Sequence, residues 1–137
     1  MAWIVFSLYS LPPVRLKKRG IWGVLCDAMG AHLFPALFIT SSLLEFIHAD
    51  KNVLWFVLIG FWAFFYGLRG ILWHQFYDRE NDRRSSTTTF ASHIKPELFR
   101  TQEVCIFSVE ILAFSGVVSF IFNLWIACSI GLYLILI

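Results

Sequence analysis

The chain has 137 residues, of which 58% are hydrophobic and only 15% charged, and its mean hydropathy is +0.71. A soluble domain of this length buries too little of its surface to hide so many apolar side chains, so the composition favours a protein embedded in lipid. The formal net charge of +2 is too small for a nucleic-acid-binding surface, and no nucleic-acid partner is expected.

Long apolar segments predict an all-α fold, a multi-spanning transmembrane helical bundle that forms a single membrane domain over residues 1–137. About 20 apolar residues cross a bilayer core, and the expected spans are residues 22–47, 53–76, 104–122 and 124–137. Pro35 lacks a backbone donor and predicts a kink in the first span, and Asn123 predicts a tight turn. Residues 1–9 and the last span are too short for a crossing, so we expect a chain truncated at both ends.

Basic residues predict the orientation of these spans, because cytoplasmic loops of membrane proteins are enriched in Lys and Arg. The loop after Tyr9 contains Arg15, Lys17, Lys18 and Arg19, and residues 78–100 contain Arg79, Arg83, Arg84, Lys95 and Arg100. The connection between these two segments has only Lys51, balanced by Asp50. Consecutive spans alternate sides, so we expect both basic loops on the cytoplasmic side of an integral, multi-pass membrane protein.

Two carboxylates follow the second span. Asp78 and Asp82 are four residues apart, so on a continuing helix they lie on one face, about one turn from each other. Such a pair repels itself unless a cation lies between its members, and oxygen ligands with phosphate partners suit Mg²⁺. His74 and Gln75 fall on nearly the same face, where they could orient the carboxylates or contact substrate. The alternative is a solvated helix end without a ligand.

The loop of residues 9–20 supplies cations on the same side of the membrane. Pro12 and Pro13 stiffen it, so Arg15 and Lys17 could be held in place beside the carboxylates. Cations and a metal-ready carboxylate pair together favour a diphosphate site. An ordinary positive-inside loop explains the same residues equally well, and the residues alone leave both interpretations open.

The two segments together resemble motifs of the UbiA-type intramembrane prenyltransferases. The first is Tyr9-Ser10-x-Pro12-Pro13-x-Arg15-Leu16-Lys17-x-Arg19-Gly20, followed by Asp27-Ala28. The second is Leu68-Arg69-Gly70-x-Leu72-x-His74-Gln75-x-x-Asp78-x-x-x-Asp82-Arg83, followed by Thr89-Phe90. Their order, their separation by about one helical hairpin and their shared side all match the later half of a family member.

The resemblance implies a helical bundle around a central cavity that transfers an isoprenyl group from a prenyl diphosphate to a lipophilic, often aromatic, acceptor. It implies that Asp78 and Asp82 bind Mg²⁺ bridging to the diphosphate, and that Arg15 and Lys17 neutralise the leaving group. The family's first aspartate-rich motif is absent from the sequence, and Ser86 stands where some relatives carry a third aspartate. We therefore expect little activity from this chain alone.

The alternative is non-enzymatic: a membrane remnant, or a half-protein that acts only with a separate N-terminal half. Other polar residues within the spans have weaker interpretations. Arg69 is expected to snorkel toward the membrane edge, while Glu110 is either functional or bonded to a neighbouring helix. Asp27 and His32 lie about one turn apart and are candidates for lining a cavity.

Overall fold

The computed structural model describes residues 2–16, 19–50, 52–84 and 89–136, and every regular element in these ranges is helical. In chain order the elements are α1 (Ala2–Ser10), α2 (Ile21–Asp27), the π-helical η2 (Ala28–Leu33), α3 (Phe34–Phe46), α4 (Val53–Tyr77), α5 (Arg79–Arg84), the 3₁₀ turn η3 (Phe90–His93), α6 (Pro96–Ile121) and α7 (Leu124–Leu136). The prediction of an all-α fold is therefore confirmed for the described residues.

Within the described residues, three helices are long and apolar enough to cross a membrane. They are the continuous rod of α2, η2 and α3 (Ile21–Phe46, 26 residues), α4 (25 residues) and α6 (26 residues). This agrees with the predicted integral membrane protein and with contact between these helices and a lipid bilayer. The third helix begins at Pro96, where Lys95-Pro96-Glu97 predicts its start, and its first two turns are polar and precede the apolar span that begins at residue 104. Proline is well tolerated there, since the first N–H groups of a helix have no intrahelical partner.

The irregularity expected at Pro35 takes the form of η2, which ends just before that residue. Proline cannot donate to the carbonyl four residues earlier, at Ala31, and a wider π-helical turn is a common way for a helix to accommodate an interruption. The turn predicted at Asn123 is also present. Its side-chain Oδ1 accepts a hydrogen bond of 3.0 Å from the backbone N–H of Ile126 and so caps the start of α7.

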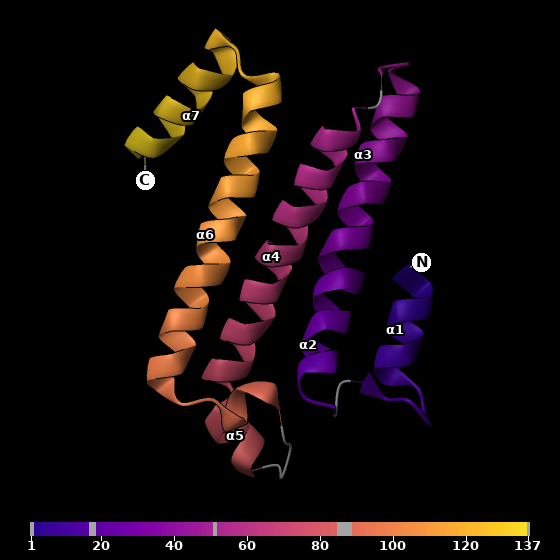
Figure 1. Cartoon of the computed structure of the whole chain (residues 1–137), viewed down its shortest axis with the longest axis vertical. Coiled ribbons are helices and arrows are strands. Elements are labelled where there is room, and N and C mark those ends of the chain that lie inside the picture. Colours follow the sequence, from indigo (N-terminus) through magenta and orange to yellow (C-terminus); the bar gives the residue numbers. More distant parts are fainter. Residues whose placement is uncertain (1, 17–18, 51, 85–88, 137) are drawn as a thin grey trace.

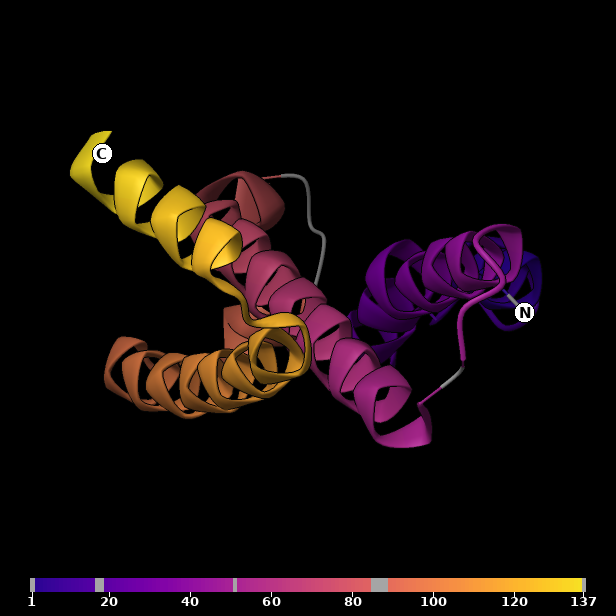
Figure 2. The same cartoon turned by 90° about the horizontal axis from the view of Figure 1, so that it is seen from above.

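Helix α4 lies in the middle of the molecule (Figures 1 and 2). One side of it packs against α6, the other against η2 and α3, and α1 packs against α2 and η2. Helix α7 projects away from the remaining helices in both views. The α1–α2 connection, α5, η3 and the start of α6 all lie at one end of the molecule, called the motif end below (Figure 1). The α3–α4 connection lies at the opposite end, called the far end.

Polar side chains tie α4 to α6. Arg69 donates two hydrogen bonds to Glu110, from Nε to Oε2 at 2.6 Å and from Nη2 to Oε1 at 2.9 Å. The expectation that Arg69 snorkels was therefore wrong, and Glu110 is bonded to a neighbouring helix. Two antiparallel helices place the charges opposite each other, and pairing avoids the cost of an isolated charge in an apolar environment. Toward the motif end, the Trp73 indole donates to Glu103. Toward the far end, the Trp55 indole donates to the Val117 carbonyl at 3.3 Å.

The opposite side of α4 makes its closest approach at Gly67. A Cβ placed on this residue would lie 2.5 Å from a ring carbon of His32 and 2.9 Å from the Cβ of His32. The His32 ring also meets Tyr66 edge to face, with 5.5 Å between ring centroids. A glycine at this position therefore allows η2 to pack directly against α4, and His32 serves as a contact between helices.

Candidate functional site

The candidate site begins where α4 ends. Asp78 follows the last residue of α4, and Asp82 lies in the short helix α5. The backbone N–H of Asp82 donates to the Asp78 carbonyl at 2.8 Å, so the chain continues in a near-helical path between the two residues. The two residues are thus about one helical turn apart along the backbone at the end of a membrane-length helix, as the spacing predicts.

A different polar neighbour contacts each carboxylate. His74 Nδ1 lies 3.4 Å from Asp78 Oδ2, one turn back along α4. The Thr89 hydroxyl donates to Asp82 Oδ2 at 3.1 Å, from beyond the segment that follows α5. Both contacts restrict a carboxylate rotamer before any ligand binds. The role of Thr89 was not predicted from the sequence, because a contact between residues seven apart leaves no periodic signal.

Gln75 connects α4 to η3. Its side-chain Oε1 accepts a hydrogen bond of 3.4 Å from the backbone N–H of Ala91, at the start of η3. The neighbouring Phe90 packs against the buried cluster of Val24, Leu72 and Phe99. Gln75 therefore positions η3 beside the carboxylates and so stabilises the Thr89 contact, while the contact of Gln75 with substrate stays a prediction.

The predicted cations are only partly placed. Arg15 is exposed and has a positive φ of 44°, and among the described residues it forms no ion pair. Lys17 lies outside the described residues. Arg19 donates to the Pro13 carbonyl at 3.4 Å within the same loop. The structure thus places this loop at the motif end (Figure 1) without showing a direct contact between Arg15 and the carboxylates.

Other cations at the motif end already have partners. Arg83 and Arg84 lie 4.0 and 3.4 Å from the Glu80 carboxylate, and the guanidinium of Arg79 lies 4.9 Å from the Phe76 ring centroid. These exposed pairs contribute little stability. They do, however, keep the positive side chains of α5 close to the carboxylates, where they raise the local positive potential that a diphosphate would meet.

Asp27 lies on the neighbouring helix. It ends α2 and is half-buried. The predicted cavity lining by Asp27 and His32 takes another form, because His32 packs between helices.

No three His, Cys, Asp or Glu side chains gather into a metal-binding group within the part of the chain that the structure describes. A Mg²⁺ ion at Asp78 and Asp82 would therefore take its remaining ligands from water and from phosphate oxygens. Mg²⁺ commonly binds in this way, through one or two carboxylates plus substrate phosphates. The donor set fits a metal that arrives with its substrate better than a permanently occupied structural metal site.

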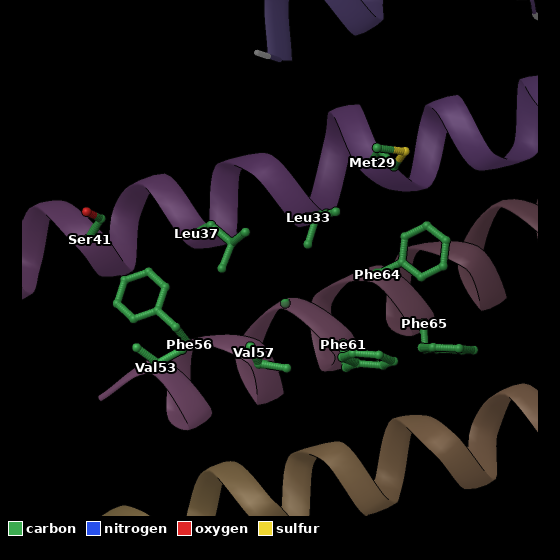
Figure 3. Close-up of a pocket in the computed structure, with 11 residues that line it drawn as sticks. Met29, Leu33, Leu37, Ser41, Val53, Phe56, Val57, Phe61, Phe64 and Phe65 are labelled. Carbon is green, nitrogen blue, oxygen red and sulfur yellow. The ribbon is translucent and has the colours of Figure 1, made fainter. Parts of the chain in front are cut away.

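A large apolar groove lies between α4 and the rod formed by η2 and α3 (Figure 3). Its volume is about 820 Å³, and it is lined by Met29, Leu33, Leu37, Ser41, Val53, Phe56, Val57, Gly60, Phe61, Phe64 and Phe65. Phe65, at the inner end, precedes Asp78 by 13 residues of α4, which corresponds to about 20 Å at 1.5 Å per residue. The groove therefore runs toward the far end and away from the carboxylates.

Comparison with known proteins adds no relative: no family model, no curated protein and no solved structure matches this chain.

Proposed function

We propose that this chain carries the diphosphate-binding part of a UbiA-type, Mg²⁺-dependent prenyltransferase. The reaction is the transfer of an isoprenyl group from a prenyl diphosphate to a lipophilic, often aromatic, acceptor. The observation that carries the proposal is the position of Asp78 and Asp82, one helical turn apart at the end of a membrane-length helix and each contacted by its own polar neighbour. Such a site handles a charged headgroup at the membrane surface while the isoprenoid stays in an apolar environment.

The chemistry follows from the residues. Cleavage of the bond between the allylic carbon and the diphosphate oxygen leaves both electrons on the diphosphate, and the allylic carbon then bonds to the acceptor, which loses a proton. Mg²⁺, when bound, neutralises charge that builds up on the departing diphosphate. Asp78 and Asp82 would hold the Mg²⁺ ion, and His74 and Thr89 restrict the rotamers of the two carboxylates. Arg15 and Lys17 are assigned to the diphosphate oxygens, where their positive charge lowers the cost of departure.

The orientation is part of the proposal. The motif end contains most of the basic residues of the chain, and the positive-inside rule assigns such loops to the cytoplasm. Prenyl diphosphate would then approach from the cytoplasmic side. We also propose that the metal site is completed from outside this sequence, because a first aspartate-rich motif is absent from it.

The test is the binding of a non-hydrolysable prenyl thiodiphosphate to the purified chain in detergent, with and without Mg²⁺. We expect binding that requires Mg²⁺ and falls by at least about tenfold in Asp78→Asn and in Asp82→Asn, since a charged contact to a metal-bound phosphate contributes more than about 1.4 kcal/mol. Glu80→Gln is the matched control, because it removes a carboxylate of α5 that pairs with Arg83 and Arg84 instead. Binding of equal affinity in all three variants would rule out the carboxylate assignment.

A further inference from the structure

The apolar groove continues into a polar pocket at the far end. Ser41 lines the groove, and it also lines a second pocket of about 670 Å³. The second pocket is formed by Phe38, Ser41, Ser42, Glu45, Phe46 and His48. The first cavity is almost entirely apolar, whereas the second offers two hydroxyls, an imidazole and a carboxylate. One end of a bound molecule would therefore meet hydrocarbon and the other end polar groups, which is the pattern of an amphiphile.

The length of the groove fits one lipid chain. Its residues on α4 run from Val53 to Phe65, a rise of about 18 Å along the helix. A bilayer core is about 30 Å thick, so each leaflet contributes about 15 Å of hydrocarbon. The groove therefore spans about one leaflet, measured from the far end. A transmembrane helix of a partner protein would need a groove along the full thickness.

The charge of the polar pocket selects the headgroup. Glu45 is exposed and is the anionic group that lines the pocket, while the charges of Asp50 and Lys51 in the connection just beyond it balance each other. Hydroxyl and carboxylate oxygens accept hydrogen bonds from an ammonium group, and a carboxylate binds it more strongly than a neutral oxygen does. A quaternary ammonium has no N–H to donate, so a primary amine headgroup is favoured over choline.

We propose that this groove and pocket bind a phosphatidylethanolamine-type lipid of the leaflet at the far end. One acyl chain lies along Leu37, Val57 and Phe61, and the ammonium group lies at Glu45. The site is independent of prenyl transfer. Its inner end is about 20 Å from Asp78 along α4, and the cluster formed by Val24, Leu72 and Phe99, with Phe90 against it, packs around the intervening turns of α4.

The experiment is native mass spectrometry of the purified, delipidated chain in detergent, titrated with phosphatidylethanolamine or with phosphatidylcholine of identical acyl chains. We expect the wild-type chain to prefer phosphatidylethanolamine by about two- to fivefold, the range of an exposed ion pair. Glu45→Gln should abolish this preference and leave phosphatidylcholine binding unchanged. An equal affinity for both lipids in the wild type, or a preference that survives Glu45→Gln, overturns the proposal.

A second variant tests the groove itself. Val57 is 46% exposed and lines the groove, so Val57→Trp fills the space without displacing a buried side chain. We expect it to weaken both lipids by about fourfold or more, the equivalent of one displaced methylene. Leu112→Trp, on an exposed position of α6 outside the groove, is the control and should change neither lipid. If Val57→Trp leaves the affinity for both lipids unchanged, the groove does not hold an acyl chain and the lipid proposal is wrong.

Discussion

The two sides of α4 make different kinds of contact with the neighbouring helices. Toward α6 the contacts are polar and aromatic, with the Arg69–Glu110 ion pair near the middle and the Phe76 and Phe99 rings stacked at 4.1 Å near the motif end. Toward η2 and α3 the helices meet closely at Gly67 and then separate around an apolar groove. Moving an apolar helix surface from lipid into a helix interface changes its free energy little, because both environments are apolar. Hydrogen bonds and close packing therefore hold helices together in a membrane. The α6 side therefore serves as scaffold, and the other side has room for a ligand.

This contrast also separates the chemistry along α4. The carboxylates lie at the motif end, beside η3, and the groove occupies the half nearer the far end (Figures 1 and 3). A helix fixed firmly to α6 can hold Asp78 in position while its other face accommodates a mobile chain. Three substitutions test this division of roles, and the expected effects decrease from the first to the last.

The largest effect is expected from the ion pair. Glu110→Gln leaves the Arg69 charge among Tyr66 and Phe107 without its carboxylate. We expect a loss of about 2–3 kcal/mol in the free energy of unfolding, measured by titration with sodium dodecyl sulfate in mixed micelles, because an unpaired charge at a buried position is costly. The double variant Arg69→Leu with Glu110→Leu should recover most of it. Unchanged stability of Glu110→Gln would show that α6 is held by other contacts.

A smaller effect is expected where α4 meets η2. Gly67→Ala places a Cβ against the ring and the Cβ of His32, so the two helices must separate, at a cost of about 1–2 kcal/mol. The same unfolding titration measures it. Gly70→Ala is the control, because nothing lies within 4 Å of its added Cβ. Combining Gly67→Ala with His32→Ala should restore part of the loss, whereas equal stability of the Gly67 and Gly70 variants would contradict the close approach.

The smallest effect is expected at the motif end of the α4–α6 interface. Trp73→Phe removes the indole donor to Glu103 and keeps most of the aromatic surface. We expect a loss of about 0.5–1 kcal/mol, since the bond is partly exposed. Trp125→Phe, on the exposed surface of α7, is the matched control and should be neutral. A loss larger than that of Gly67→Ala would mean that this bond, rather than the helix packing, determines the position of Asp78.

The sequence predicts the membrane helices well, because long apolar runs have few alternatives. The apolar run predicts the start of α4 correctly at Val53, and Lys95-Pro96-Glu97 predicts the start of α6, whose first two turns are too polar to belong to the apolar run. The pairing of Arg69 with Glu110 could not be predicted from the sequence. Apolar residues occur on every side of α6 and therefore do not indicate which face packs against α4.

The sequence also predicts part of the candidate site, but not all of its contacts. The spacing of Asp78 and Asp82 determines their separation along the helix, since only local backbone geometry is involved. The Thr89 contact and the structural role of Gln75 depend on how the following segment folds back, and no periodic pattern encodes that path. The groove depends on the distance between two helices, which composition does not determine; close contacts lie both at Gly67 and, within the groove, at Gly60.

The central claim is that Asp78 and Asp82 bind a divalent metal together with a prenyl diphosphate. The most direct measurement uses Mn²⁺ in place of Mg²⁺ and records its electron paramagnetic resonance with ³¹P electron–nuclear double resonance, in the presence of prenyl thiodiphosphate. The account predicts protein-bound Mn²⁺ with ³¹P coupling that disappears in Asp78→Asn and persists in Glu80→Gln. Protein-bound Mn²⁺ with the same ³¹P coupling in Asp78→Asn and Asp82→Asn would contradict it.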